Sequence, residues 1–223
     1  PVLAIATQPA AAFSPTATPE PSPTLTLTPA PSLTPTPAYP ESFYIRNISG
    51  HGQAYALSCE ASAAVDWANF FGVAIYESNF QIELPISDNP DYGYVGDPTT
   101  RGWGQIPPYA YGVHADPVAD LLVAYGLPAK SVKGYSLEQV MAKLAEGKPI
   151  LVWIIGNMEY SEPVEYIDKE GRTSIVAPFE HAVILTGYNQ ETIRYMSNGK
   201  FYVPHQVFLT SWGVLGNMAV IAE

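Results

Sequence analysis

Apolar residues recur every three to four positions in three stretches of the chain, and this spacing predicts three helices. The first helix runs from about Ser58, which can cap its start, to Phe71, and Gly72 follows its end. The second is expected at 116–125 and the third at 136–147. Glycines mark the ends of these two as well, and the third opens with serine and glutamine in capping-box spacing.

The spacing of apolar residues changes after residue 148. Continuous apolar runs at 149–155 and 181–188 are typical of strands that are buried on both faces. Helices first and then a mostly antiparallel sheet predict an α+β domain, with one helix packed against the sheet. Further strands are predicted at 192–197, 201–203 and 218–221. The first two of these flank Asn198-Gly199, which favours a hairpin turn.

Residues 83–111, between the first and second helices, are rich in Gly, Pro, Asp and Tyr. This composition predicts a long irregular segment. Irregular segments of such length are usually functional, so we expect this one to shape a substrate cleft.

The first forty residues differ from the rest, because they are mostly Pro, Thr, Ala and Ser, with Glu20 as the only charged residue. Such a composition predicts a disordered stalk at 1–40, and a globular domain at 41–223. The apolar opening, with a small-residue cleavage pattern at 4–6, resembles the end of an export segment. We therefore expect an extracellular or cell-surface protein; an ordinary interdomain linker is the alternative.

The net charge of the protein limits the classes of molecule that it is expected to bind. The 223 residues carry a formal net charge of −11. Nucleic-acid binding is not expected, because there is no basic patch to neutralise phosphates.

A membrane-spanning helix is not expected either. No continuous apolar segment of the sequence approaches the roughly 20 residues that span a bilayer.

Cys59 is the single cysteine, so an internal disulfide and a zinc site built from several thiolates are excluded. Its predicted place is the first turn of the first helix, where unpaired N–H groups favour a thiolate. A nucleophilic thiol is one interpretation, and a small core residue on an alanine-rich helix is the other.

The general base for such a thiol would come from one of four histidines. His181 opens a buried strand, which can hold an imidazole in a fixed orientation. We expect structural or surface roles for His51, His114 and His205.

Two further residues have suitable chemistry. Gln53 lies six residues before Cys59, and its side-chain amide could join the Cys59 N–H in binding an oxyanion. Asn198 could orient the imidazole of His181, although asparagine is also a favourable hairpin-turn residue.

The pattern Gln53-x5-Cys59 on a helix, with a distant His-Ala-Val-x-x-x-Gly-Tyr strand from His181, resembles papain-like cysteine peptidases. Within them the chain is most similar to the bacterial double-glycine-peptidase-like group, the peptidase C-thirty-nine-like family. The similarity continues at 57–62, 89–98, 111–115 and 146–153, and in the ending around Phe208, Trp212, Gly216, Ala219 and Val220.

This resemblance implies a papain-like fold in which Cys59 is the nucleophile, His181 the base and Gln53 the oxyanion donor. It implies hydrolysis of peptide or isopeptide bonds in a peptide or protein substrate, with no metal or organic cofactor. We expect the protein to be a monomer. Cleavage of double-glycine leaders is not expected, since the relatives with that activity are fused to membrane transporters.

The chain departs from the family at the third site, where an Asp followed by Pro is usual. Counting from His181 without a gap places Ser197 there, and a shift of one residue places Asn198. The papain-type sequence around the cysteine is also absent, because Glu60 follows Cys59. An inactive binding module and an acyltransferase on the same scaffold therefore stay open as alternatives.

Overall fold

A computed structural model describes residues 39–223 of the chain. The predicted stalk and export segment therefore lie outside the described residues, apart from positions 39 and 40.

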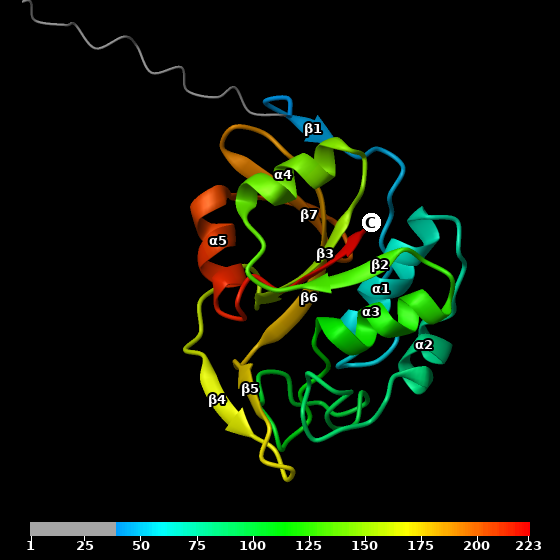
Figure 1. Cartoon of the computed structure of the whole chain (residues 1–223), viewed down its shortest axis with the longest axis vertical. Helices are drawn as coiled ribbons and strands as arrows, with labels where there is room; N and C mark the ends of the chain where they lie inside the picture. Colours follow the sequence, from blue (N-terminus) through cyan, green and yellow to red (C-terminus); the bar gives the residue numbers. More distant parts are fainter. Residues whose placement is uncertain (1–38) are drawn as a thin grey trace, which may run out of the picture. The chain divides into compact units, whose positions relative to one another are not determined.

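Five helices and nine strands make up the described chain, and Figure 1 labels most of them. The helices are α1 (Cys59–Phe70), α2 (Glu77–Glu83), α3 (Ala115–Ala124), α4 (Leu137–Ala145) and α5 (His205–Gly213). The strands are β1 (Phe43–Tyr44), β2 (Ala129–Val132), β3 (Ile150–Ile155), β4 (Val164–Ile167), β5 (Thr173–Val176), β6 (Glu180–Tyr188), β7 (Thr192–Met196), β8 (Lys200–Pro204) and β9 (Ala219–Ala222).

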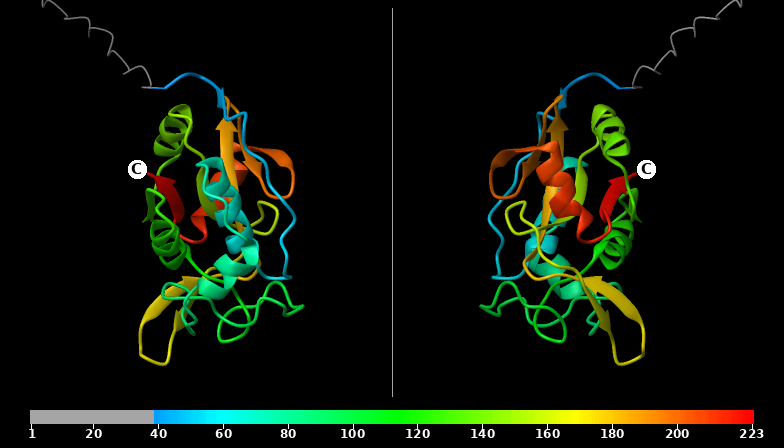
Figure 2. Two further views of the ribbon diagram at one scale, coloured as in Figure 1. Left: turned by 90° about the vertical axis from the view of Figure 1, so that its right-hand side faces the viewer. Right: turned by 90° about the vertical axis from the view of Figure 1, so that its left-hand side faces the viewer.

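The sheet has seven strands, with β2, β9, β3, β6, β7 and β8 side by side in that order and β1 paired to β6. Every pairing within it is antiparallel. Strands β4 and β5 form a separate hairpin that extends away from the sheet (Figure 2, yellow). Helices and an antiparallel sheet confirm the predicted α+β class.

Strand β3 and most of β6 are buried, as their continuous apolar sequences predict. Helix α1 lies against both strands. It approaches closely because Ala61, Ala64 and Ala68 face the core and are fully buried. The indole N–H of Trp67 donates to the carbonyl of Pro149 at 2.8 Å and fixes the helix beside the start of β3.

The antiparallel register pairs Ile154 with His181 and Ile155 with Glu180, at the beginning of β6. The first turn of α1 and the first residues of β6 together form the site described below. The fold thus brings two segments together that are more than a hundred residues apart.

Most predicted elements are confirmed within one or two residues, including the capping box of α4, in which Ser136 and Gln139 each bond the other's backbone N–H. The prediction that Ser58 caps the start of α1 is wrong. Ser58 is the residue before α1, but its side chain makes no capping bond and instead donates to Glu77. Helices α2 and α5 and the β4–β5 hairpin are not predicted by the apolar spacing. The irregular segment predicted at 83–111 begins one residue later, because Glu83 is the last residue of α2; residues 84–111 of the described structure hold no helix.

Candidate active site

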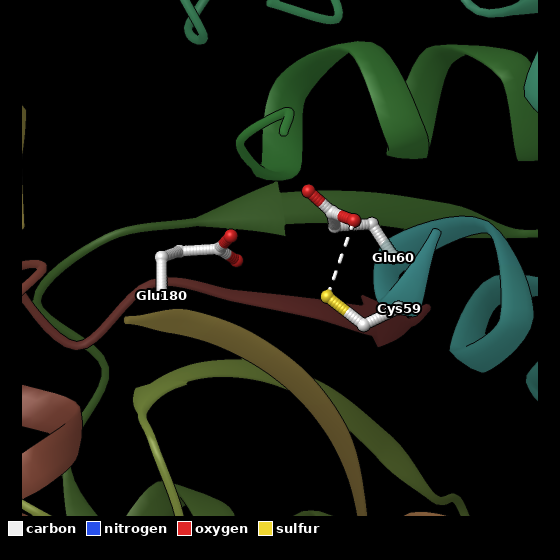
Figure 3. A group of neighbouring side chains, drawn as sticks. All are labelled: Cys59, Glu60 and Glu180. Atoms are coloured by element: carbon white, nitrogen blue, oxygen red, sulfur yellow. Dashed lines mark hydrogen bonds between the residues drawn. The ribbon is translucent and has the colours of Figure 1, made fainter. Parts of the chain in front are cut away.

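Cys59 is the first residue of α1 and is partly buried. Its thiol donates to Oε2 of Glu60 at 3.2 Å, as Figure 3 shows. Burial, together with the nearby carboxyl groups of Glu60 and Glu180, raises the pKa of the thiol well above its usual value. An N–H of Ala182 acts in the opposite direction but is outweighed. The resting thiol is therefore protonated at neutral pH.

His181 is the second residue of β6. Its Nε2 lies 3.3 Å from Oγ of Ser197, which follows β7. Burial lowers the pKa of His181 to about 4, so the imidazole is neutral near pH 7 and can accept a proton. Ser197 is the residue that the ungapped count from His181 places at the third site.

Cys59 and His181 both line two adjoining cavities. The larger, of about 500 Å³, is also bounded by Ser197, Asn198 and Phe201. The smaller, of about 350 Å³, is also bounded by Glu60, Trp103, Tyr111 and Glu180. Because the two cavities share Cys59 and His181, a chain passing through both would run across the thiol.

Gln53 lines both cavities, but its side-chain amide is engaged locally. Its Nε2 donates to the carbonyls of Tyr55 and Ala56 at 2.8 and 2.9 Å. Binding an oxyanion would require one of these N–H groups to leave its loop carbonyl. Asn198 lies on the wall of the larger cavity, with no hydrogen bond to His181 among the described residues.

The loop that carries Gln53 is held by Glu77, a buried residue at the start of α2. Glu77 accepts hydrogen bonds from the Ala54 N–H, from the Ser58 hydroxyl and from Nε2 of His51. The other ring nitrogen of His51 lies 2.8 Å from Asp66 on α1. His51 therefore has a structural role, and Glu77 ties the loop before Cys59 to α2.

Glu60 and Glu180 are two buried acids whose importance the sequence reasoning missed. Oε1 of Glu60 accepts the N–H of Val113 at 2.7 Å. Neither oxygen of the Glu180 carboxyl group has a hydrogen-bond partner in the described chain. Burial raises the pKa of Glu60 to about 7, and burial and then Glu60 raise that of Glu180 well above its usual value. The sequence offered one sign of their importance. Each glutamate adjoins a proposed catalytic residue, Cys59 or His181, within an apolar segment.

None of the five helices described in residues 39–223 has the length and apolar character of a membrane span.

Comparisons with known proteins bear on this arrangement. The sequence model of the Peptidase_C39 like family matches residues 45–219. A crystal structure described as a C39-like peptidase from Bacillus anthracis is 21% identical with a TM-score of 0.72, covering 82% of this chain and 97% of its own. A double glycine motif protease from an AMS/PCAT transporter, solved with its leader peptide, is 16% identical with a TM-score of 0.51, covering 80% of this chain and 92% of its own.

A search of curated proteins gives no match. The two structures confirm the predicted fold of the C39-like peptidases, and the family model covers well over half of the sequence. The chain therefore belongs to the Peptidase_C39 like family and is a cysteine peptidase.

Proposed function

We propose that Cys59 is the nucleophile and His181 the general base of this peptidase. The observation that carries the proposal is that the single thiol of the chain and a neutral, buried imidazole line the same two cavities. The thiol stands at the N-terminus of α1, whose unpaired N–H groups favour negative charge on sulfur during attack.

The proton of the thiol passes to His181 as the sulfur attacks the substrate carbonyl, because both groups are neutral beforehand. Since Nε2 of His181 faces Ser197, Nδ1 is the nitrogen that takes this proton. Sγ first breaks its hydrogen bond to Glu60. The imidazolium then protonates the leaving amine, and water hydrolyses the thioester with His181 again as base.

The backbone N–H of Cys59 supports the oxyanion, and Gln53 joins it once its amide releases one of its loop carbonyls. Ser197 orients the imidazole. In this proposal Asn198 shapes the cleft and the hairpin without contacting the base.

The proposed substrate is a peptide or protein segment in extended conformation. Two cavities that meet at Cys59 provide space on both sides of the bond to be cleaved. Trp103, from the irregular segment after α2, lines the smaller cavity and donates its indole N–H to the carbonyl of Glu180. This segment therefore shapes one side of the cleft.

The test incubates the full chain with a mixture of unrelated peptides in oxygen-18 water and identifies the products by mass spectrometry. Hydrolysis predicts new carboxyl termini that carry the heavy isotope, which are lost in Cys59→Ala and strongly reduced in His181→Ala. A second incubation includes an added amine. Products that lack the heavy isotope and are joined to this amine would show an acyltransferase instead. Cleavage that persists in Cys59→Ala would refute the proposal.

We further propose that the peptidase acts outside the cell. Support comes from the Pro- and Thr-rich sequence of residues 1–40 and from the apolar opening at 1–6. Fractionation of the producing cells tests this: protein accessible to added protease on intact cells is expected, and protein confined to the cytoplasm would contradict it.

A further inference from the structure

The sulfur of Cys59 and the carboxyl groups of Glu60 and Glu180 form a compact cluster (Figure 3). One ligand atom from each residue lies within 4.8 Å of the other two. Both carboxyl groups are nearly inaccessible to solvent, with residue exposures of 1% for Glu60 and 4% for Glu180. The Glu180 side chain points towards the other two residues.

No positively charged side chain from the described part of the chain pairs with this cluster. Within residues 39–223, neither Glu60 nor Glu180 forms an ion pair. Both oxygens of Glu180 are buried without a hydrogen-bond donor. Buried carboxyl groups normally have hydrogen-bond or charge partners, because removing them from water without one is costly.

The neighbouring backbone makes room for the two carboxyl groups. A Cβ at Gly112 would collide with Oε1 of Glu60 and would lie 3.2 Å from Oε2 of Glu180. Glycine at this position therefore lets both acids approach one another next to the thiol.

We propose that Cys59, Glu60 and Glu180 bind a divalent metal ion of the zinc type, which blocks the nucleophile reversibly. One thiolate and two carboxylates are a donor set that Zn²⁺ accepts, at about 2.3 Å for sulfur and about 2.0–2.2 Å for oxygen. Ligand atoms on a tetrahedral ion lie roughly 3.5 Å apart, so side-chain adjustments of about 1 Å close the site. Sγ and Oε2 of Glu60 are already 3.2 Å apart.

A metal ion suits this cluster better than a substrate ammonium group, because sulfur is a weak hydrogen-bond acceptor but a strong zinc ligand. The adjoining cavities, both lined by Cys59, provide the route of entry. Binding forms one metal–sulfur and two metal–oxygen bonds. It releases to solvent the proton of the thiol and those that the two carboxyl groups carry.

A second acidic cluster, formed by Asp88, Asp168 and Glu170, provides a contrast. There the side chain of Arg172 already lies 2.6 Å from Asp168 and 3.0 Å from Glu170. That cluster has its counter-charge, whereas the described residues supply none to the cluster at Cys59.

The experiment titrates the metal-free full chain with Cd²⁺ and follows the sulfur-to-cadmium charge-transfer absorbance. The parent is expected to bind one ion, and Cys59→Ala to lose the absorbance. Glu180→Gln, which keeps the size of the side chain, is expected to weaken binding at least tenfold. Glu165→Gln, an exposed glutamate on β4, is the matched control and is expected to bind as the parent does.

Calorimetry of the parent in two buffers of different ionisation enthalpy counts the released protons, and needs no variant. At least one proton per ion at pH 7 is expected, because the thiol must ionise to bind the metal. Equal Cd²⁺ affinity in a folded Glu180→Gln variant would overturn the proposal by leaving that carboxyl group out of the site, and release of no proton would overturn it by leaving the thiol out. The absorbance does not depend on catalysis, so a chain that binds Cd²⁺ but cleaves no peptide would refute only the proposed function.

Discussion

Glu77 is expected to hold the loop before the active-site helix, and its removal should cost much more stability than its place on a short helix suggests. Three donors reach its carboxylate: the Ala54 N–H, the Ser58 hydroxyl and Nε2 of His51. Ser58 is fully buried and Glu77 is 7% exposed, so Glu77→Ala removes a buried hydrogen bond and leaves the Ser58 hydroxyl only the longer contact to the Tyr55 carbonyl at 3.2 Å.

A hydrogen bond to a charged group contributes about 1.5–3 kcal/mol, and Glu77→Ala removes two of them, from the Ser58 hydroxyl and the Ala54 N–H. The contact with His51 counts for less, because that side chain is 44% exposed. The expected loss for Glu77→Ala is therefore about 3 kcal/mol. With a urea m-value of about 2 kcal/mol per molar, the midpoint of unfolding should fall by roughly 1.5 M.

Urea unfolding measured by circular dichroism tests this, with Glu83→Ala as the control on the same helix. Glu83 is exposed and accepts one hydrogen bond, from the Tyr125 hydroxyl, so its loss should cost less than about 1 kcal/mol. Equal midpoints for the two variants would refute the role of Glu77 as a clamp.

Three other predictions follow from described contacts. Burial opposes the charge on His51, but the contacts with Asp66 and Glu77 outweigh it and raise the pKa of His51. The stabilisation of the fold by protonated His51 is therefore complete below the unfolded pKa of about 6.5, and it is lost as pH rises through the folded pKa. His51→Gln should therefore destabilise the protein more at pH 5.5 than at pH 8.5 in urea unfolding, and the reverse order would contradict it. Gly112→Ala should lower the free energy of unfolding by at least about 2 kcal/mol, because Gly112 has a φ of +135° and the added Cβ would meet Glu60. A change below about 0.5 kcal/mol would contradict this and show that the loop adapts to the added Cβ. Ser197→Ala should lower kcat about three- to tenfold, because it removes one hydrogen bond to His181. Asn198→Ala should lower kcat less. A larger effect of Asn198→Ala would assign the orientation of His181 to Asn198 instead.

The sequence predicts those parts of the fold whose signals are local. Strands β3 and β6 are continuous apolar runs, and α4 begins at a capping box, so composition and spacing determine them. Helix α2 is short and its ends lack capping side chains. Its position depends instead on distant contacts such as those of Glu77 with the loop before Cys59, which the order of residues along the chain does not show.

The site is predictable to a similar degree. A thiol at a helix start and a histidine at a strand start have recognisable sequence contexts, and the fold brings them to common cavities. The relation between Glu60 and Glu180 depends on tertiary packing, because they come from α1 and β6 and meet only when the helix docks on the sheet. The engagement of the Gln53 amide with its own loop carbonyls is likewise a matter of local geometry that residue type does not reveal.

The claim that Cys59 attacks a carbonyl with His181 as its base is tested most directly by trapping the acyl-enzyme. The full chain is mixed with a peptide nitrophenyl ester, quenched in acid within the first turnover, and digested for mass spectrometry. The account predicts a burst of about one nitrophenolate per chain with the acyl group on Cys59, and acylation slowed by about a hundredfold or more in His181→Ala. An acyl group on another residue, or an undiminished burst in His181→Ala, would contradict it.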